Sequence, residues 1–288
     1  MHTDSAPAAI AGTLFIVATP IGNLDDLTRR AEQVLSSVDL IAAEDTRHSG
    51  RLLQYLGINK AMWALHEHNE RERSESLLDR IDAGESVALI SDAGTPLISD
   101  PGYVLVRAAR RRGIRVVPVP GACAMVAALS AAGLPTDRFL FAGFLPAKSA
   151  ARTKALETLA RETATLVLYE SPRRISALLQ DIKSTLGDCR EVVLARELTK
   201  AFETFYSGSV VDVLEAVNAD PHSAKGEYVV MVAGAAETVT DQVAVDADRV
   251  LTLLLTELPV KKAVKLAAEL TGRARNDLYQ RALELKGA

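Results

Sequence analysis

Short apolar runs alternate with helical patterns between Thr13 and Val119, and this alternation limits the fold more than any other feature of the sequence. The apolar runs span residues 14–18, 40–43, 87–90 and 114–119, and the helical patterns span 27–35, 46–56 and 103–112. Such alternation predicts an α/β domain with a mostly parallel sheet. Pro118, Pro120 and Gly121 then interrupt the pattern, so we expect this first domain to end near residue 120.

A second stretch opens with a helix of small residues at 122–132 and continues with further strands. Strand patterns lie at 139–144, 165–169, 191–196, 202–206 and 228–232, with helices at 150–161 and 172–186. The hairpin-like spacing between Ala195 and Tyr206 predicts a mixed sheet. Two facing α/β domains leave a cleft between them, and such clefts are favoured sites for ligands.

The chain changes character after Gly234. Small and polar residues at 235–245 predict a linker, and three short helices are expected at 248–258, 260–270 and 276–285, with Pro259 and Gly272 as stops and Asn276 as an N-cap. This pattern resembles a helix-turn-helix unit, and a packing or dimerisation appendage is the alternative. The predicted organisation is a disordered lead at 1–11, α/β domains at 12–120 and 121–234, the linker, and a basic helical extension at 246–288.

Composition and charge exclude several classes of protein. With 48% hydrophobic and 24% charged residues, the chain is not disordered, collagen-like or coiled-coil. The net charge of −4 disfavours coating of nucleic acid by bulk positive charge. The charge is uneven, however, because the extension from Asp246 to Ala288 holds eight basic and six acidic residues and is therefore +2, leaving −6 for the rest.

Membrane insertion and cysteine-based sites are not expected. No apolar stretch reaches the roughly 20 residues that cross a bilayer, and the first twelve residues do not resemble a signal peptide, so we expect a cytoplasmic protein. Cys123 and Cys189 lie far apart without CxxC spacing, which argues against a disulfide framework or a cysteine-built metal site.

Turn-rich segments follow two of the predicted strands. They lie at the carboxyl ends of these strands, which is where α/β proteins bind their ligands. One is Pro20-Ile21-Gly22 after the strand at 14–18, and the other is Asp92-Ala93-Gly94-Thr95-Pro96 after the strand at 87–90. Neither segment matches GxGxxG or GxxxxGK[ST], so both lack the glycines that a dinucleotide-binding motif or a P-loop requires. Asp100 and Pro101 are expected to be the N-cap and first residue of the next helix, which leaves Asp92 as the more functional carboxylate.

Charged clusters occupy other strand ends. Glu44, Asp45 and Arg47 follow the strand at 40–43, where helix capping and a functional role are both open. Arg173 and Arg174 follow the strand at 165–169, with Pro172 expected at the first helical position, and paired arginines suit phosphate contacts.

Two further polar groups are weaker signals. Lys200 and Glu203 form an acid–base group that local salt bridging also explains. His66 and His68 point the same way on a strand, but no third ligand is identifiable from the spacing. Polar contact with a substrate, or simple exposure, is therefore preferred to a metal site.

Taken together, the motifs resemble one family. The segments are TPIGNL at 19–24, EDTR at 44–47, HNE at 68–70, SDAGTP at 91–96, PVPGA at 118–122, YESPRR at 169–174 and RELTK at 196–200. This series resembles the family of ribosomal RNA small subunit methyltransferase I, in the tetrapyrrole methylase superfamily. The resemblance implies two α/β domains with S-adenosylmethionine bound between them, a homodimer, and methylation of the 2′-hydroxyl of a decoding-centre cytidine in 16S rRNA of the small ribosomal subunit.

The resemblance also implies a set of site residues. The cofactor site is expected to use Pro20, Ile21, Gly22, Asp92, Ala93, Gly94, Thr95, Pro96, Gly121, Ala122, Gly226 and Glu227. RNA contacts are expected from Arg47, His68, Asn69, Arg173 and Arg174. A ribose hydroxyl is a weak nucleophile at neutral pH, so a general base or a polarising cation is expected among Glu44, Asp45, Lys200 and Glu203, and no metal is required.

Two alternatives remain open at this stage. A methylase of a small tetrapyrrole would share the fold and the cofactor, but the helical extension and the YESPRR segment argue against it. A helix-turn-helix regulator whose α/β part senses a ligand would bind duplex DNA tightly through the extension and show no turnover.

Overall fold

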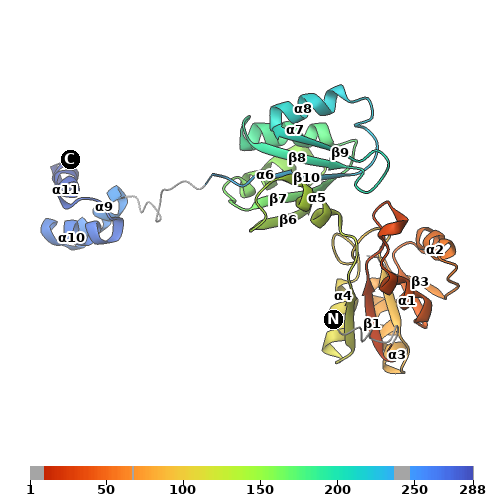
Figure 1. Ribbon diagram of the computed structural model, residues 1–288. Helices are drawn as coiled ribbons and strands as arrows, with labels where there is room; N and C mark the ends of the chain where they lie inside the picture. Colours follow the sequence, from red (N-terminus) through yellow and green to blue (C-terminus); the bar gives the residue numbers. More distant parts are fainter. Residues whose placement is uncertain (1–9, 67, 237–246, 288) are drawn as a thin grey trace, which may run out of the picture. The chain divides into compact units, whose positions relative to one another are not determined.

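The first half of the chain forms a parallel sheet of five strands, seen at the lower right of Figure 1. The computed structural model describes residues 10–66, 68–236 and 247–287. The strands are β1 Thr13–Val17, β2 Leu40–Ala43, β3 Met62–Ala64, β4 Val87–Ile90 and β5 Arg115–Val119. Their order is β3–β2–β4–β1–β5, and every neighbouring pair is parallel, which confirms the prediction for this half.

Helices cover both faces of this sheet. They are α1 Arg29–Ser37, α2 Thr46–Tyr55, α3 Glu70–Asp82 and α4 Tyr103–Arg111, and a short 3-10 helix, η1, spans Leu24–Asp26. Successive side chains of a strand point to opposite faces. Leu14 therefore packs with Leu77 on the side of α3 and α4, whereas Phe15 packs with Val34 on the side of α1 and α2. Covered faces explain why β2 and β4 are continuous apolar runs.

The next part of the chain forms a mixed sheet of five strands. These are β6 Phe139–Phe144, β7 Thr165–Glu170, β8 Glu191–Arg196, β9 Thr204–Ser209 and β10 Tyr228–Val232. Their order is β6–β7–β10–β8–β9, with β6 and β7 parallel and the other neighbours antiparallel. Helices α6 Ser149–Leu159, α7 Ile175–Leu186 and α8 Val210–Ala219 pack on one face, and α5 Ala124–Ala132 packs on the other.

Both sheets belong to one compact unit that ends at Ala235. Ile21, from the turn after β1, packs with Leu129 of α5 and Val229 of β10 in one hydrophobic cluster. The hydroxyl of Thr95 donates a hydrogen bond to the carbonyl of Ala122 at 3.0 Å. The turns of the first sheet therefore contact the α5 face of the second sheet.

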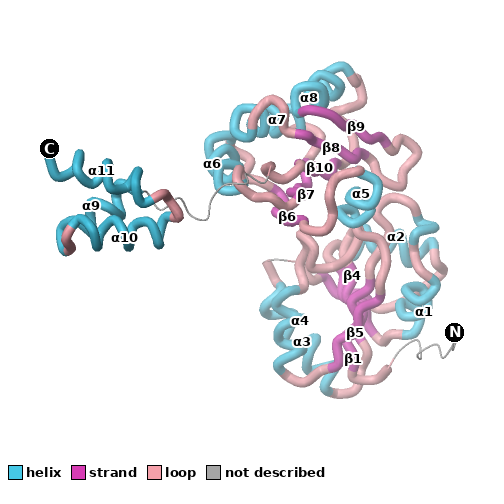
Figure 2. The backbone as a smooth tube through the Cα atoms, turned by 60° about the vertical axis from the view of Figure 1, so that its left-hand side comes forward, coloured by secondary structure: helices cyan, strands magenta, loops and turns pink. Residues whose placement is uncertain are grey.

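Residues 236–288 form a second unit with its own small core. Its helices are α9 Ala247–Glu257, α10 Val260–Thr271 and α11 Arg275–Gly287, drawn in cyan in Figure 2. Leu251 and Leu278 are buried between them. Three helices are confirmed here, but α11 already begins at Arg275, so Asn276 lies inside its first turn and the predicted N-cap is wrong.

Several elements differ from those predicted. The strand β3 and the helices α3 and α8 were not predicted, because β3 has only three residues and α3 is dominated by charged side chains. Pro172 lies in a turn before α7 begins at Ile175, and the amide of Arg174 donates to the carbonyl of Ser171 within that turn, so Pro172 is not the first helical residue. The predicted linker at 235–245 lies almost wholly outside the described residues.

Candidate active site

The turns after β1 and β4 meet at the carboxyl edge of the first sheet. Thr19 and Gly94 exchange two backbone hydrogen bonds of 2.8 and 3.1 Å. The Thr19 hydroxyl also donates to the carbonyl of Ser91 at 3.2 Å. Gly94 has a φ of 89°, which residues with a side chain rarely adopt. These bonds fix the segments 20–22 and 92–96 next to each other.

A cavity of about 390 Å³, called here the first cavity, opens between these turns and the second sheet. Its apolar wall includes Ile21, Tyr169 and Val229, and carboxylates reach it from Asp100 and Glu227. An apolar wall with a few polar groups is typical of a site for a small organic ligand.

An aromatic cluster stiffens one wall of the first cavity. The ring of Tyr169 makes edge-on contacts with Phe141 and Phe144, at centroid distances of 5.0 and 5.7 Å. Its hydroxyl accepts a hydrogen bond from the amide of Met125 at 3.2 Å. Burial raises the pKa of Tyr169, so this hydroxyl stays neutral and acts as an anchor for α5 rather than as a base.

A second cavity of about 350 Å³ adjoins the first, since Ile21, Ala93 and Glu227 line both. Basic residues line the second cavity and not the first, because His48, Arg51 and Lys200 belong to its lining together with the carboxylates of Asp92 and Glu227. Two adjoining cavities suit a reaction between two ligands, and the basic side chains favour a ligand that carries negative charge in the second cavity.

Lys200 lines the second cavity and forms ion pairs with two carboxylates. Its Nζ lies 2.8 Å from Glu197 Oε1 and 3.2 Å from Glu227 Oε2. Its aliphatic chain lies directly over Gly22, where a Cβ atom would collide with it. Burial alone lowers the pKa of Lys200, but the hydrogen bonds and charges of the two glutamates outweigh burial and raise that pKa. Lys200 is therefore a fixed cation at neutral pH.

The other predicted catalytic residues have local partners. Asp45 is the N-cap of α2, and the hydrogen bond from the Arg47 side chain lowers the pKa of its carboxyl. The backbone amide of Asp45 donates to Asp92 Oδ1 at 3.1 Å. Glu203 accepts a hydrogen bond from the amide of Thr199 at 2.7 Å, which closes the loop that presents Lys200. Glu44 is half-buried at the end of β2 and makes interactions of its own.

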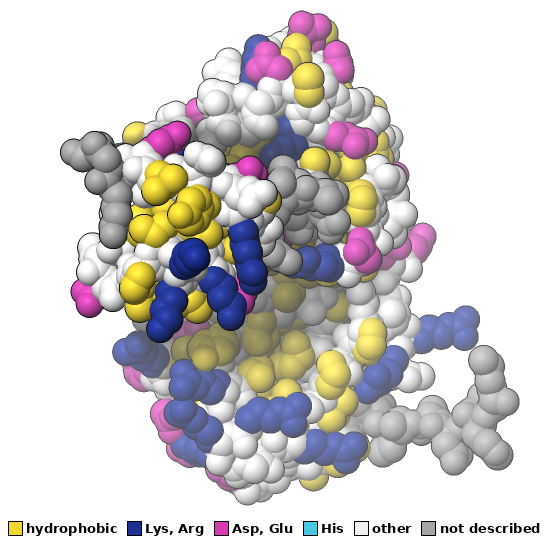
Figure 3. Space-filling view, turned by 90° about the vertical axis from the view of Figure 1, so that its left-hand side faces the viewer, with side chains coloured by type: hydrophobic (Ala, Val, Ile, Leu, Met, Phe, Trp, Pro, Cys, Tyr) yellow, Lys and Arg dark blue, Asp and Glu magenta, His cyan; other side chains and the backbone are white. Residues whose placement is uncertain are grey.

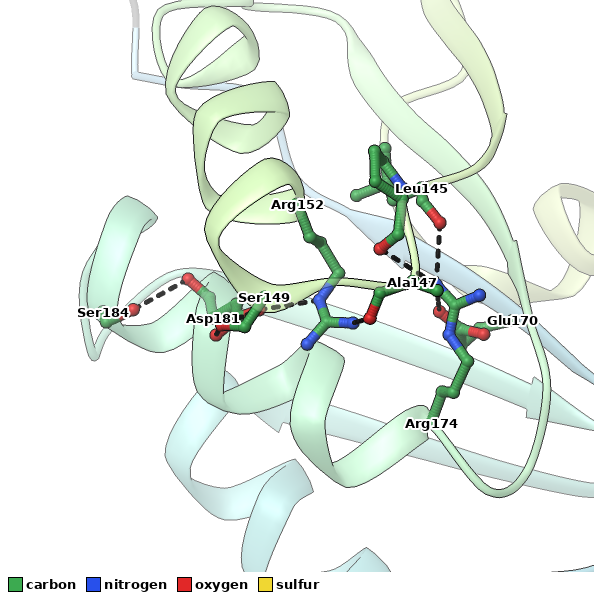
Figure 4. A network of polar contacts seen from close by, with 9 residues as sticks. Leu145, Ala147, Ser149, Arg152, Glu170, Arg174, Asp181 and Ser184 are labelled. Atoms are coloured by element: carbon green, nitrogen blue, oxygen red, sulfur yellow. Dashed lines mark hydrogen bonds and ion pairs between the residues drawn. The ribbon is translucent and has the colours of Figure 1, made fainter.

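Arg174 is turned toward its own domain. In Figure 4 its guanidinium reaches the carbonyl of Leu145, at 2.7 Å, and it also donates to the carbonyl of Pro146 at 3.2 Å. It forms an ion pair of 3.1 Å with the fully buried carboxylate of Glu170. Arg173 is exposed. Of the two arginines expected to meet phosphate, Arg173 is thus the one open to solvent, and Arg174 is engaged internally.

Arg152 completes this network (Figure 4). It is only 3% exposed, and it donates to Asp181 at 2.7 Å and to the carbonyl of Ala147 at 3.2 Å. Ser149 adds a bond to the same carboxylate at 3.0 Å. The two arginines therefore hold the backbone just beyond Phe144, which lines the first cavity. Sequence reasoning missed Arg152, because nothing near it in the chain marks its partner 29 residues away.

The residues expected to bind the cofactor fall into three groups. Some line the first cavity, namely Gly94 and Thr95, or both cavities, namely Ile21, Ala93 and Glu227. Others line only the second, namely Pro20, Gly22 and Asp92. The rest line neither, namely Pro96, Gly121, Ala122 and Gly226. Gly121 and Gly226 instead allow close packing. A Cβ on Gly121 would lie 2.9 Å from the Cβ of Ala18, and one on Gly226 would collide with the side chain of Glu197.

Asp100 is a cavity residue that sequence reasoning assigned to helix capping. The N-cap of α4 is Gly102, not Asp100, so the predicted cap is wrong. Just before Asp100, Leu97 and Ser99 have φ values of 74° and 64°, an unfavourable conformation that is not helical. Burial raises the pKa of Asp100 to about 6; a hydrogen bond from Ser91 opposes the rise and the charge of Asp92 adds to it.

A carboxylate from α3 takes the capping role instead. Glu70 is 8% exposed, and its Oε1 accepts hydrogen bonds from the amides of Gly102 and Val104, both at 2.9 Å. Asn69 beside it accepts a bond from the amide of His66, so Asn69 stabilises a turn, and the histidines at 66 and 68 lie after β3 ends, not on a strand. His68 is exposed.

Replacing Glu70 is expected to destabilise the protein. Glu70→Ala removes both acceptor bonds from α4 and should lower the free energy of unfolding by about 2–3 kcal/mol. Glu70→Gln keeps an oxygen in the same place and should lose less than half as much. Urea unfolding of both variants measures this, and equal losses would contradict the capping role.

The part of the chain that the structure describes contains neither a group of metal ligands nor a membrane-spanning helix. Among residues 10–66, 68–236 and 247–287, His, Cys, Asp and Glu side chains form no group of three or more that could hold a metal ion. Within the same ranges, no helix combines the length and the apolar character needed to span a bilayer.

Comparison with known proteins agrees with this architecture. The family model of tetrapyrrole (corrin/porphyrin) methylases matches residues 13–213. Among solved structures, diphthine synthase superposes with a TM-score of 0.59 and 15% identity over 77% of this chain and 90% of that one. The methyltransferase CobJ gives 0.58 and 21% identity over 78% and 95%. The fold is that of the tetrapyrrole methylases, and the chain belongs to the tetrapyrrole methylase family.

Closer relatives narrow the assignment within that family. A Pseudomonas aeruginosa protein named ribosomal RNA small subunit methyltransferase I is 56% identical over 96% of this chain and 99% of its own length. Its namesake in Escherichia coli O157:H7 is 55% identical over 96% of both chains. The model of the RsmI C-terminal HTH domain matches residues 241–286. The chain is thus a member of the ribosomal RNA small subunit methyltransferase I family.

Proposed function

We propose that the protein methylates the ribose 2′-hydroxyl of a decoding-centre cytidine, cytidine 1402 of 16S rRNA, in the small ribosomal subunit. The observation that carries the proposal is the near full-length identity, above 50%, with relatives named for small-subunit rRNA methylation. The two adjoining cavities support it, because they provide separate places for a methyl donor and a nucleoside.

The first cavity fits S-adenosylmethionine, the cofactor of this family. Its apolar wall suits an adenine ring, and the carboxylates of Asp100 and Glu227 suit the positive charges of the methionine part. When bound, the cofactor supplies an electrophilic methyl group. The chain itself supplies an apolar wall for the cofactor with Ile21 and the aromatic cluster around Tyr169.

The second cavity is proposed to hold the target nucleoside. Lys200 is protonated at neutral pH, so it does not accept the hydroxyl proton; it stabilises negative charge that develops on the ribose oxygen. Asp92 and His48 are the groups of this cavity proposed to accept the proton, since the third candidate, Glu227, is ion-paired with Lys200. Asp45 and Glu203 are then positioning residues: the Asp45 carboxylate caps α2 and so fixes the backbone amide that bonds to Asp92, and Glu203 fixes the loop of Lys200.

The substrate class is tested by supplying both kinds of acceptor. With tritiated S-adenosylmethionine, the protein is expected to label RNA in small subunits that lack the modification and to leave a porphyrinoid unlabelled. Transfer of label to the porphyrinoid alone would favour the tetrapyrrole alternative. Tight binding of duplex DNA without any transfer would favour the helix-turn-helix regulator.

A further inference from the structure

A segment near the first cavity contains basic residues and no acidic ones. Between Pro101 and Thr136 the sequence contains five arginines and no Asp, Glu or Lys; the arginines are Arg107, Arg110, Arg111, Arg112 and Arg115. All five are exposed; Arg107, Arg110 and Arg111 lie on α4, Arg112 follows it directly, and Arg115 is the first residue of β5. The segment follows directly after Asp100, a residue of the first cavity.

Three side chains form a ridge along α4. Tyr103, Arg107 and Arg111 are spaced by four residues, so they lie on one face of the helix at intervals of about 6 Å along its axis. Tyr103 is 61% exposed, and the guanidinium of Arg107 lies over its ring at 5.8 Å. The ridge therefore starts at the cavity side of the helix and extends away from it.

Arg112 differs from the other four arginines because it is ion-paired. Arg112 forms ion pairs with Glu75, Asp79 and Asp82 of α3. In the described part of the chain, no carboxylate lies within ion-pair distance of Arg107, Arg110, Arg111 or Arg115. Figure 3 views the molecule from the side on which α4 lies, and Lys and Arg side chains gather on the lower half of that face.

The physical consequence is a positive field without a local counter-charge. Neighbouring like charges repel one another, and they cost stability unless a ligand neutralises them. A polyanion gains from such a site by releasing its condensed counterions. Arginine also forms the bidentate, charge-assisted bonds that phosphates favour.

We propose that the α4 ridge, with Arg110 and Arg115 beside it, binds the sugar-phosphate backbone of the RNA that flanks the target nucleotide. This inference rests on the proposed rRNA substrate. Its contacts position the RNA, whereas the second cavity selects the nucleoside. The ridge therefore contributes to the affinity for RNA and to the salt dependence of that affinity. It does not contribute to sequence specificity.

The test uses the full chain with Arg107→Gln and Arg111→Gln combined. Binding to 30S subunits lacking the modification, and to a decoding-centre RNA fragment, is measured over a range of salt concentrations. Loss of two phosphate contacts is expected to reduce the slope of log K against log salt by about 1.5 and to weaken binding roughly 10- to 30-fold at 0.1 M salt. Unchanged affinity for S-adenosylmethionine shows that the variant is folded.

Two matched variants control for charge alone. Lys154→Gln with Arg161→Gln removes the same charge from exposed positions on or just after α6 and should leave the slope unchanged. Arg107→Lys combined with Arg111→Lys keeps both positive charges and should keep most of the parent protein's salt dependence. If the Gln pair binds RNA like the parent protein while the parent methylates it, the inference is wrong and the ridge serves another partner. If the parent neither binds nor methylates the RNA, the proposed function itself fails.

Discussion

Lys200→Met is expected to lower kcat for methylation of small-subunit RNA roughly 100- to 1000-fold, the usual effect of losing one group that stabilises charge in the transition state. Affinity for S-adenosylmethionine should not fall, because Lys200 lines only the second cavity and its removal frees Glu227, which lines both cavities, to attract the cationic cofactor. Methionine preserves the aliphatic chain that lies over Gly22.

The conservative variant and the pH profile separate the roles open to Lys200. Lys200→Arg keeps the cation and should retain a substantial fraction of the activity. Because the pKa of Lys200 is raised, the parent enzyme should show no dependence on the neutral amine near pH 7. An activity that rises only as this amine loses its proton would identify Lys200 as the base and contradict the account.

Asp100→Asn is expected to weaken binding of S-adenosylmethionine about tenfold at pH 7.5, equivalent to about 1.4 kcal/mol. In the parent protein the carboxyl has a pKa of about 6, so it is charged above that pH and attracts the cationic cofactor. As pH falls below 6 the carboxyl becomes neutral, and parent and variant should converge. The cofactor, by stabilising the carboxylate, should in turn lower the pKa of Asp100.

In the part of the chain that the structure describes, no cation faces Asp100, so the effect of its charge can be measured by comparing Asp100→Asn with a control variant. The groups that face it are Ser91, Asp92 and Tyr169, and none of these pairs it with a cation. Asp137→Asn, at an exposed position away from the first cavity, should bind the cofactor like the parent at every pH. Calorimetric titration between pH 5 and 8 provides the measurement. A tenfold loss in Asp100→Asn that persists unchanged at pH 5 would show that the charge is not responsible.

Local patterns were sufficient to predict much of the fold. The strands β2, β4 and β8 have the predicted bounds, because each is a short apolar or β-rich run between clear turns. The turn residues 92–96 were placed at the end of β4 because Gly94 and its neighbours are recognisable in sequence. Elements without such a signal, such as the charged helix α3, were missed.

The site depends on contacts that local sequence does not encode. Glu70 takes the cap of α4 that Asp100 was expected to form, because a buried carboxylate from another helix satisfies both amides. Lys200 rests on Gly22 only after the two sheets have come together. Arg174 has the charge for phosphate, but the carbonyl of Leu145 and the carboxylate of Glu170 hold it inside.

The central claim is tested most directly by locating the transferred methyl group. Small subunits lacking the modification are incubated with the protein and labelled S-adenosylmethionine, and the RNA is digested to nucleosides and to mapped fragments. The account predicts label in 2′-O-methylcytidine within the decoding-centre fragment, and its loss with Lys200→Met. Label on a base atom, or in a fragment outside the decoding centre, would contradict it.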